Sequence, residues 1–244
     1  MGCRNSAEQI KRQPQATYRG SSQTHSIQTT RPSLSSPITL HYFDIYGRAE
    51  AIRMVLAYLD LSYIDHRVEF SEWPSLKQSP MCEFEQLPVL DIDGHLLVQS
   101  RAALRYLCQI HSLYPTSAKD IYLLESLCDE IEDLRTPLLE LTFKKDLEGL
   151  NKRYNNDVAK MLPNLQTRLV RNGSKAGFFV GGKATMADFA VFEFLWDYFL
   201  MAGKRESRGV AVERFPKLLA FAEKMQRLSP SLETYLSERP MKWL

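Results

Sequence analysis

The sequence has no long hydrophobic run and almost no net charge. None of its apolar stretches approaches the roughly 18 consecutive residues of a membrane-spanning helix, so we predict no transmembrane segment. Its 31 basic and 29 acidic residues leave a formal charge of +2, which is too small for a nucleic-acid-binding surface, so no nucleic-acid partner is expected. With 44% hydrophobic residues, the 244-residue chain can bury one large core or two small ones.

Cysteine is also scarce, with four residues and no Cys-x-x-Cys pair. None of the four has a histidine at the spacing typical of a metal site, so no metal is predicted. Cys108 and Cys128 fall within segments expected to be helical. We therefore expect reduced thiols packed on helices, and a cytoplasmic, reducing compartment.

Residues 1–36 lack an apolar period, and Glu8 is their only acidic residue beside five Lys and Arg. Such a segment cannot offset the entropy cost of ordering, so we predict a disordered basic arm. It begins Met-Gly-Cys-Arg-Asn-Ser, which fits the pattern for N-myristoylation of Gly2, with Cys3 placed for palmitoylation. Two acyl chains and the basic residues would hold the protein at the cytoplasmic face of a membrane. The alternatives are a chance match and an Arg- and Ser-rich transit peptide.

A hairpin is the clearest local signal in the rest of the chain. The Asp-Gly pair at 93–94 lies between two apolar runs, which predicts strands over 89–92 and 95–98 joined by a tight turn.

The residues on either side of the hairpin offer two anchor points for a peptide-like anion. The bond between Leu87 and Pro88 can be cis, which would turn the Leu87 N–H and C=O toward an extended peptide beside the sheet. After the hairpin, Gln99 and Ser100 open a helix, with Ser100 expected at the N-cap. The Ser100 hydroxyl and the free N–H groups after it form a site for a carboxylate.

Strand and helix patterns alternate around this stretch. Residues 38–43 and 61–68 are predicted strands, and apolar residues at a 3.6 spacing predict a helix over 49–59. With the hairpin and its helix, the order is βαβ, an irregular segment, then ββα. This is the order of a thioredoxin-like domain, which we place at residues 37–112.

The second half of the chain is predicted to be all-helical, with a domain at residues 118–240. A stripe of apolar residues spaced three and four apart predicts a core helix: Leu124, Leu127, Ile131, Leu134 and Leu138. Thr185 and Asp188 have the spacing of a capping box at the start of a helix that is apolar nearly all round. The expected fold class is therefore an α/β domain followed by a helical bundle.

Several motifs together resemble the cytosolic glutathione transferases of the Tyr type, nearest the sigma class. They are YFDIYGRAEAIRMVLAY from residue 42, QLP from 86, QS from 99, EIEDLR from 130 and FFVGGKATMADFAVFEFL from 178. The resemblance covers about four fifths of the chain. It implies that the Leu87-Pro88 backbone pairs with the cysteinyl unit of glutathione and that Gln99 and Ser100 hold its γ-glutamyl carboxylate.

The same resemblance assigns the catalytic residues. It implies that Tyr42 donates its hydroxyl to the glutathione sulfur and that Arg48 lies near this sulfur or supports the loop. Trp73 and Lys77 match residues that contact the glycyl end of glutathione, and an indole N–H and an ammonium group both suit a carboxylate.

Two further glutathione contacts are implied. Gln86 belongs to the Gln-Leu-Pro motif, although the sequence departs from the family at Glu85, where relatives often have glycine. Asp133 matches a residue that reaches across a homodimer to the γ-glutamyl amine of the glutathione held by the partner subunit.

The implied function is conjugation of the glutathione thiolate to hydrophobic electrophiles, which is a detoxification reaction with glutathione as co-substrate. Two alternatives stay open. One is a glutathione-dependent isomerase of the prostaglandin D synthase kind, for which Tyr46 and the helical surfaces would decide. The other is a non-catalytic binding or structural protein like the lens crystallins of this branch, which the retention of Tyr42 disfavours.

Overall fold

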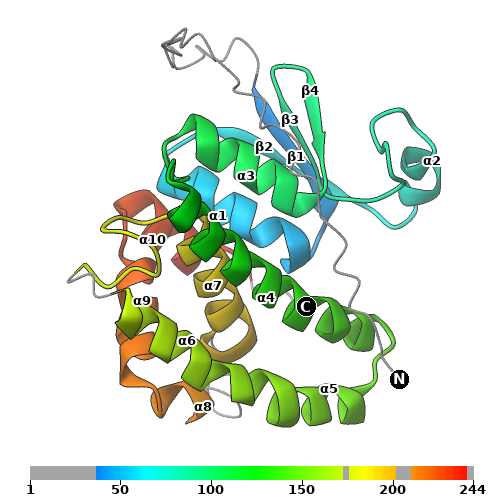
Figure 1. The fold of residues 1–244 in the computed structure, drawn as a ribbon. Helices are drawn as coiled ribbons and strands as arrows, with labels where there is room; N and C mark the ends of the chain where they lie inside the picture. Colours follow the sequence, from blue (N-terminus) through cyan, green and yellow to red (C-terminus); the bar gives the residue numbers. More distant parts are fainter. Residues whose placement is uncertain (1–36, 173–175, 202–209, 241–244) are drawn as a thin grey trace, which may run out of the picture. The chain divides into compact units, whose positions relative to one another are not determined.

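A four-stranded mixed sheet forms the first part of the structure. The computed structural model describes residues 37–172, 176–201 and 210–240, so the predicted arm at 1–36 lies outside the described residues. The strands are β1 (Ile38–Phe43), β2 (Tyr63–Val68), β3 (Val89–Ile92) and β4 (His95–Val98). Their order in the sheet is β2-β1-β3-β4, with β1 parallel to β2 and antiparallel to β3 (Figure 1).

Three helices accompany the sheet. They are α1 (Glu50–Tyr58), α2 (Trp73–Lys77) and α3 (Ser100–Ile110), and a single 3-10 turn (Gly47–Ala49) precedes α1. Residues Ile38, Leu40 and Tyr42 alternate along β1 on its buried face, and α1 contacts α3 beside the sheet (Figure 1). The predicted order βαβ-ββα is confirmed.

Local turn chemistry explains the hairpin and the late start of β2. Asp93 and Gly94 have φ values of 53° and 78°, as a type I′ turn requires. At the end of α1, Asp60 adopts a φ of 54°, and the Leu61 N–H bonds to the Leu56 carbonyl oxygen at 3.0 Å. This capping arrangement occupies Leu61, so β2 starts at Tyr63 rather than at the predicted residue 61.

Helices make up the rest of the described chain. They are α4 (Ala118–Phe143), α5 (Leu147–Arg153), α6 (Ala159–Arg171), α7 (Met186–Leu195), α8 (Val210–Glu213), α9 (Pro216–Gln226) and α10 (Pro230–Glu238), with wider helical turns at Tyr154–Val158 and Trp196–Leu200. The predicted apolar stripe of α4 is buried throughout. Among the described helices, none carries an apolar stretch long enough to cross a membrane.

Helix α7 lies at the centre of the bundle. All ten of its residues are buried, and it contacts α1, α3, α4 and α9. Its start is fixed by Asp188, whose carboxylate accepts the N–H groups of Phe179 and Thr185, both at 2.8 Å. The predicted capping box is therefore present, and it satisfies N–H groups that would otherwise be buried without a partner.

A chain of ion pairs runs through α4 and joins α7 to the loop after β1. The Arg135 guanidinium donates to Glu193 of α7 and to Glu132, and Glu132 also accepts from Arg48. Arg135 and Glu193 are buried. Burial raises the pKa of Glu193, and the charge of Arg135 opposes that effect. Loss of either partner would leave a buried charge uncompensated, a change that costs about 3–5 kcal/mol in other proteins.

A second buried cluster holds the end of α10 against α1. The Arg239 guanidinium pairs with Glu50, the first residue of α1, and with Asp197 at 2.5 Å. Glu50 also pairs with Arg53 at 3.1 Å, and the Tyr46 hydroxyl donates to the Pro240 carbonyl oxygen at 2.5 Å. The last described turn of the chain is thereby tied to the segment that leads into α1.

Candidate active site

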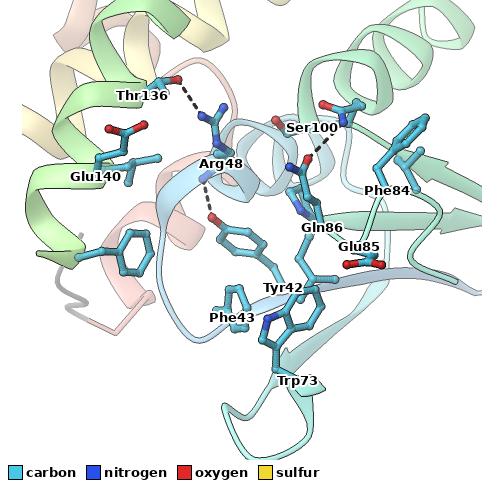
Figure 2. A pocket seen from close by; sticks show the side chains of 16 residues that line it. Tyr42, Phe43, Arg48, Trp73, Phe84, Glu85, Gln86, Ser100, Thr136 and Glu140 are labelled. Carbon is cyan, nitrogen blue, oxygen red and sulfur yellow. Dashed lines mark hydrogen bonds between the residues drawn. The ribbon is translucent and has the colours of Figure 1, made fainter. Parts of the chain in front are cut away.

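One pocket gathers most of the residues predicted to bind glutathione (Figure 2). It has a volume of about 430 Å³. Eight of the predicted residues line it: Tyr42, Arg48, Trp73, Gln86, Leu87, Pro88, Gln99 and Ser100. They come from the end of β1, the loop behind it, α2, the segment before β3 and the start of α3, and one face of α4 closes the opposite side.

The Tyr42 hydroxyl is held by the main chain of the following loop. Tyr42 is the fifth residue of β1, and its Oη accepts the Arg48 N–H at 3.1 Å (Figure 2). Burial raises the pKa of Tyr42, while the Arg48 N–H and three nearby guanidinium groups act in the opposite direction. The phenol therefore remains protonated at neutral pH. Because its oxygen accepts from the loop, its proton is available to an acceptor in the pocket.

Gly47 makes this approach of the loop possible. A Cβ at Gly47 would lie 2.6 Å from Tyr42 Oη, which is too short for any side chain, and 3.2 Å from the nearest ring carbon, which is a tight contact. Gly47 also has a φ of +44°, in the left-handed region that favours glycine. The glycine of the Gly-Arg-Ala-Glu motif is thus explained by contact with the Tyr42 hydroxyl.

The Arg48 side chain turns away from Tyr42 toward α4. Its guanidinium donates to Thr136 Oγ1 at 2.7 Å (Figure 2). It also donates to the Glu132 carboxylate. The main-chain N–H of Arg48 therefore contacts Tyr42 while its side chain bridges the loop to the helical bundle. Arg48 was expected either to lie near the glutathione sulfur or to support the loop after β1, and this geometry favours support of the loop.

Leu87 presents main-chain polar groups at the pocket. The Leu87-Pro88 peptide bond is cis, as the sequence allowed. In the part of the chain that the structure describes, the N–H and C=O of Leu87 have no hydrogen-bond partner. A donor and an acceptor on one residue suit the main chain of an extended peptide.

The start of α3 differs from the prediction by one residue. Gln99, with a φ of 65°, is the N-cap, and Ser100 is the first helical residue, so the placement of Ser100 at the N-cap was wrong. The Gln99 side chain makes no capping hydrogen bond to the helix. Its Nε2 instead donates to Gln86 Oε1 at 3.3 Å (Figure 2). Ser100 still lines the pocket, at the positive end of an 11-residue helix.

Trp73 and Lys77 begin and end α2, but only Trp73 lines the pocket. The Trp73 ring packs edge-to-face on Phe43, with centroids 5.3 Å apart. Lys77 instead pairs with Glu85 at 3.3 Å. Glu85 has a φ of +53°, in the left-handed region that favours glycine.

Two further residues, besides Lys77, lie away from the pocket. Asp133 is exposed on α4 and is not among the lining residues. Tyr46 was expected to help decide between conjugation and isomerisation, but its ring is buried beneath the Arg239 guanidinium, 4.2 Å from its centroid. Tyr46 therefore cannot contact an electrophile in this pocket, and that expectation was wrong.

The wall that α4 supplies to the pocket was not predicted from the sequence. It consists of Thr136, Leu139, Glu140 and Phe143. These positions follow the i, i+3, i+4, i+7 spacing of one helix face, so the signal was present beside the core stripe of the same helix. Phe43, Phe84, Glu85 and Val98 complete the lining.

Comparison with known proteins agrees with this geometry. The model of the glutathione S-transferase N-terminal domain matches residues 38–109, and the model of the C-terminal domain matches residues 132–239. A probable glutathione S-transferase 5 of Caenorhabditis elegans is 31% identical over 209 residues, covering 83% of this chain and 96% of the relative. The chain belongs to the glutathione S-transferase family. Glutathione is the co-substrate of this family, so the predicted family, enzyme class and co-substrate are confirmed.

Other similar proteins include a prostaglandin D synthase and a crystallin. The hematopoietic prostaglandin D synthase of Gallus gallus is 31% identical over 206 residues, and S-crystallin SL11 of Nototodarus sloanii is 29% identical over 205 residues. Both matches cover 82% of this chain and 96% of the relative. Among solved structures, the monomeric glutathione S-transferase Na-GST-3 of Necator americanus superposes with a TM-score of 0.72 at 26% identity, covering 86% of this chain and all of that one.

The contact between Gly47 and Tyr42 generates a prediction. Gly47→Ala should lower kcat for glutathione conjugation at pH 6.5 about tenfold or more, because the new methyl group displaces the Tyr42 hydroxyl, and the Kd for glutathione should change only a few fold. Gly94→Ala is the matched control, since Gly94 also has a positive φ, of +78°, but faces open space. Steady-state kinetics and titration calorimetry on the two folded variants measure both effects. Wild-type kcat in Gly47→Ala would contradict the proposed contact.

Proposed function

We propose that this glutathione S-transferase activates the glutathione thiol with Tyr42 and conjugates the thiolate to hydrophobic electrophiles. The observation that carries the proposal is the Tyr42 hydroxyl, which accepts the Arg48 N–H at 3.1 Å and keeps its own proton for an acceptor in the pocket. The free main-chain groups of Leu87 and the α3 N-terminus at Ser100 support binding of the peptide and its carboxylate.

The energetics of thiol activation are consistent with one strong hydrogen bond. Lowering the thiol pKa from about 8.5 by about two units requires ~2.7 kcal/mol of preference for the thiolate. A hydrogen bond to a charged acceptor contributes ~1.5–3 kcal/mol, so the Tyr42 hydroxyl supplies most of what is needed. Proximity of the thiolate to an electrophile held against α4 then adds to the rate.

Replacing the hydroxyl tests this role. Tyr42→Phe should lower kcat about 10- to 100-fold at pH 6.5 while leaving the Kd for glutathione within a few fold, because the lost hydrogen bond serves the thiolate rather than the peptide. Tyr122→Phe is the control, since Tyr122 is 69% exposed on α4 and lies outside the pocket. An unchanged rate in Tyr42→Phe, measured with 1-chloro-2,4-dinitrobenzene, would rule out the proposed role.

Isomerisation of a prostaglandin precursor is the second candidate. It is favoured by the hematopoietic prostaglandin D synthases among the similar proteins. Both reactions need the same activated thiolate, so Tyr42→Phe should impair both. Assays with aryl halides and with a prostaglandin endoperoxide, run on one preparation, distinguish the two candidates.

We also propose that the protein forms a homodimer in which Asp133 contacts the γ-glutamyl amine of the glutathione held by the partner subunit. The support is the family motif and the exposed position of Asp133 on α4, which leaves its carboxylate accessible to a second subunit. The similar Necator americanus enzyme is described as monomeric, so the oligomeric state has to be measured directly.

Asp133→Ala should therefore weaken glutathione binding about tenfold without dissociating the dimer, since it removes one charge-assisted hydrogen bond. Glu130→Ala, an exposed acid on the same helix, should leave binding unchanged. Titration calorimetry and light scattering after size exclusion give the Kd and the mass. A fully active monomer would disprove the arrangement.

We also propose that acylation of Gly2 and Cys3 holds the protein at the cytoplasmic face of a membrane. The support is the sequence pattern alone, because both residues lie outside the described residues. If both residues are acylated, Gly2→Ala should release the protein from membranes completely. Cys3→Ser should leave the weak, reversible attachment of a single chain. Fractionation of cells expressing the three forms measures this, with conjugation activity as the control. A wild-type protein found only in the soluble fraction would show that the pattern is a chance match or a transit peptide.

A further inference from the structure

The side of the pocket opposite Leu87 is a wall of α4 with mixed character. Leu139 is 5% exposed and Phe143 is 60% exposed, so this wall offers apolar surface to an electrophile. Glu140 lies on the same face, one position after Leu139, and also lines the pocket (Figure 2). A carboxylate is therefore placed beside the apolar surface that Leu139 and Phe143 offer.

The charge of Glu140 is not neutralised, in contrast to the other charged residues of the pocket. Arg48 pairs with Glu132, and Glu85 pairs with Lys77 at 3.3 Å. Glu140 has no ion pair with any residue that the structure describes. Its negative charge therefore acts on whatever occupies the space between α4 and Tyr42.

We propose that Glu140 sets the substrate class of this pocket by rejecting electrophiles that carry a negative charge and accepting neutral or cationic apolar ones. This inference rests on the proposed conjugation at Tyr42. Apolar contact with Leu139 and Phe143 attracts hydrophobic compounds of any charge, so discrimination has to come from a repulsive element. Glu140 is exposed, so water partly screens its charge and the expected discrimination is only a few fold. An electrophile that also carries a fatty-acid carboxylate falls in the rejected class.

Three chloronitrobenzenes with one reacting group test the proposal. They are 1-chloro-2,4-dinitrobenzene, which is neutral, 4-chloro-3-nitrobenzoate, and 4-chloro-3-nitro-N,N,N-trimethylanilinium. In each case the thiolate sulfur forms a bond to the ring carbon that carries chlorine, and chloride leaves with the bonding electron pair. Dividing each kcat/KM by the uncatalysed rate constant with glutathione removes the difference in intrinsic reactivity.

Glu140→Gln should raise the normalised kcat/KM for the benzoate about fivefold relative to the neutral compound, and should lower that for the anilinium by a similar factor. Glu130→Gln, an acid on α4 outside the pocket, should leave both ratios unchanged. Added NaCl at about 0.5 M should reduce the discrimination of the wild type, because salt screens the charge. Equal ratios in the wild type and Glu140→Gln would overturn the proposal.

A binding measurement separates this proposal from the proposed function. The three S-aryl glutathione conjugates can be made chemically, and titration calorimetry gives their Kd values without turnover. We expect the anionic conjugate to bind the wild type about fivefold more weakly than the neutral one, and this difference to disappear in Glu140→Gln. If that pattern holds but no aryl halide is conjugated, the proposed function fails and the role of Glu140 stands. If the Kd ratios are the same in both proteins, the role of Glu140 is disproved.

Discussion

The geometry of the site depends on the ion pairs of the buried Arg135 guanidinium. It compensates Glu193 in the centre of the bundle and orients Glu132, which in turn holds the Arg48 side chain. The Arg48 N–H then fixes the Tyr42 hydroxyl. A buried ion pair is not by itself a strong source of stability. In this chain it connects the packing of α7 to the position of one phenol oxygen.

The sequence predicted best those features that a few adjacent residues determine. The Asp93-Gly94 turn, the strands on either side of it and the Thr185-Asp188 cap follow from local backbone preferences, and each lies where it was predicted. The N-cap of α3 was misplaced by one residue, because Gln99 has a non-helical φ of 65° and the helix already begins at Ser100. Helix ends are commonly uncertain by one or two residues, so local patterns locate the helix better than its first residue.

The α4 wall of the pocket could not be predicted in the same way. The spacing of Leu139, Glu140 and Phe143 identifies a helix face, but only the packing of α4 against α7 decides that this face meets the end of β1. Tyr46 is a residue that the sequence placed near the site and the structure places away from it. It lies four residues after Tyr42 in a functional motif, yet it packs beneath Arg239 in the core.

The ion pair between Glu50 and Arg239 also has a consequence for synthesis of the protein. Glu50 is buried at the start of α1, directly after the loop that carries Gly47 and Arg48, and one of its two cationic partners is 189 residues further along the chain. On the ribosome, α1 emerges long before Arg239. The acid at its start therefore lacks part of its native compensation until Arg239 can pack against it, so this buried cluster is completed only when α10 docks on α1.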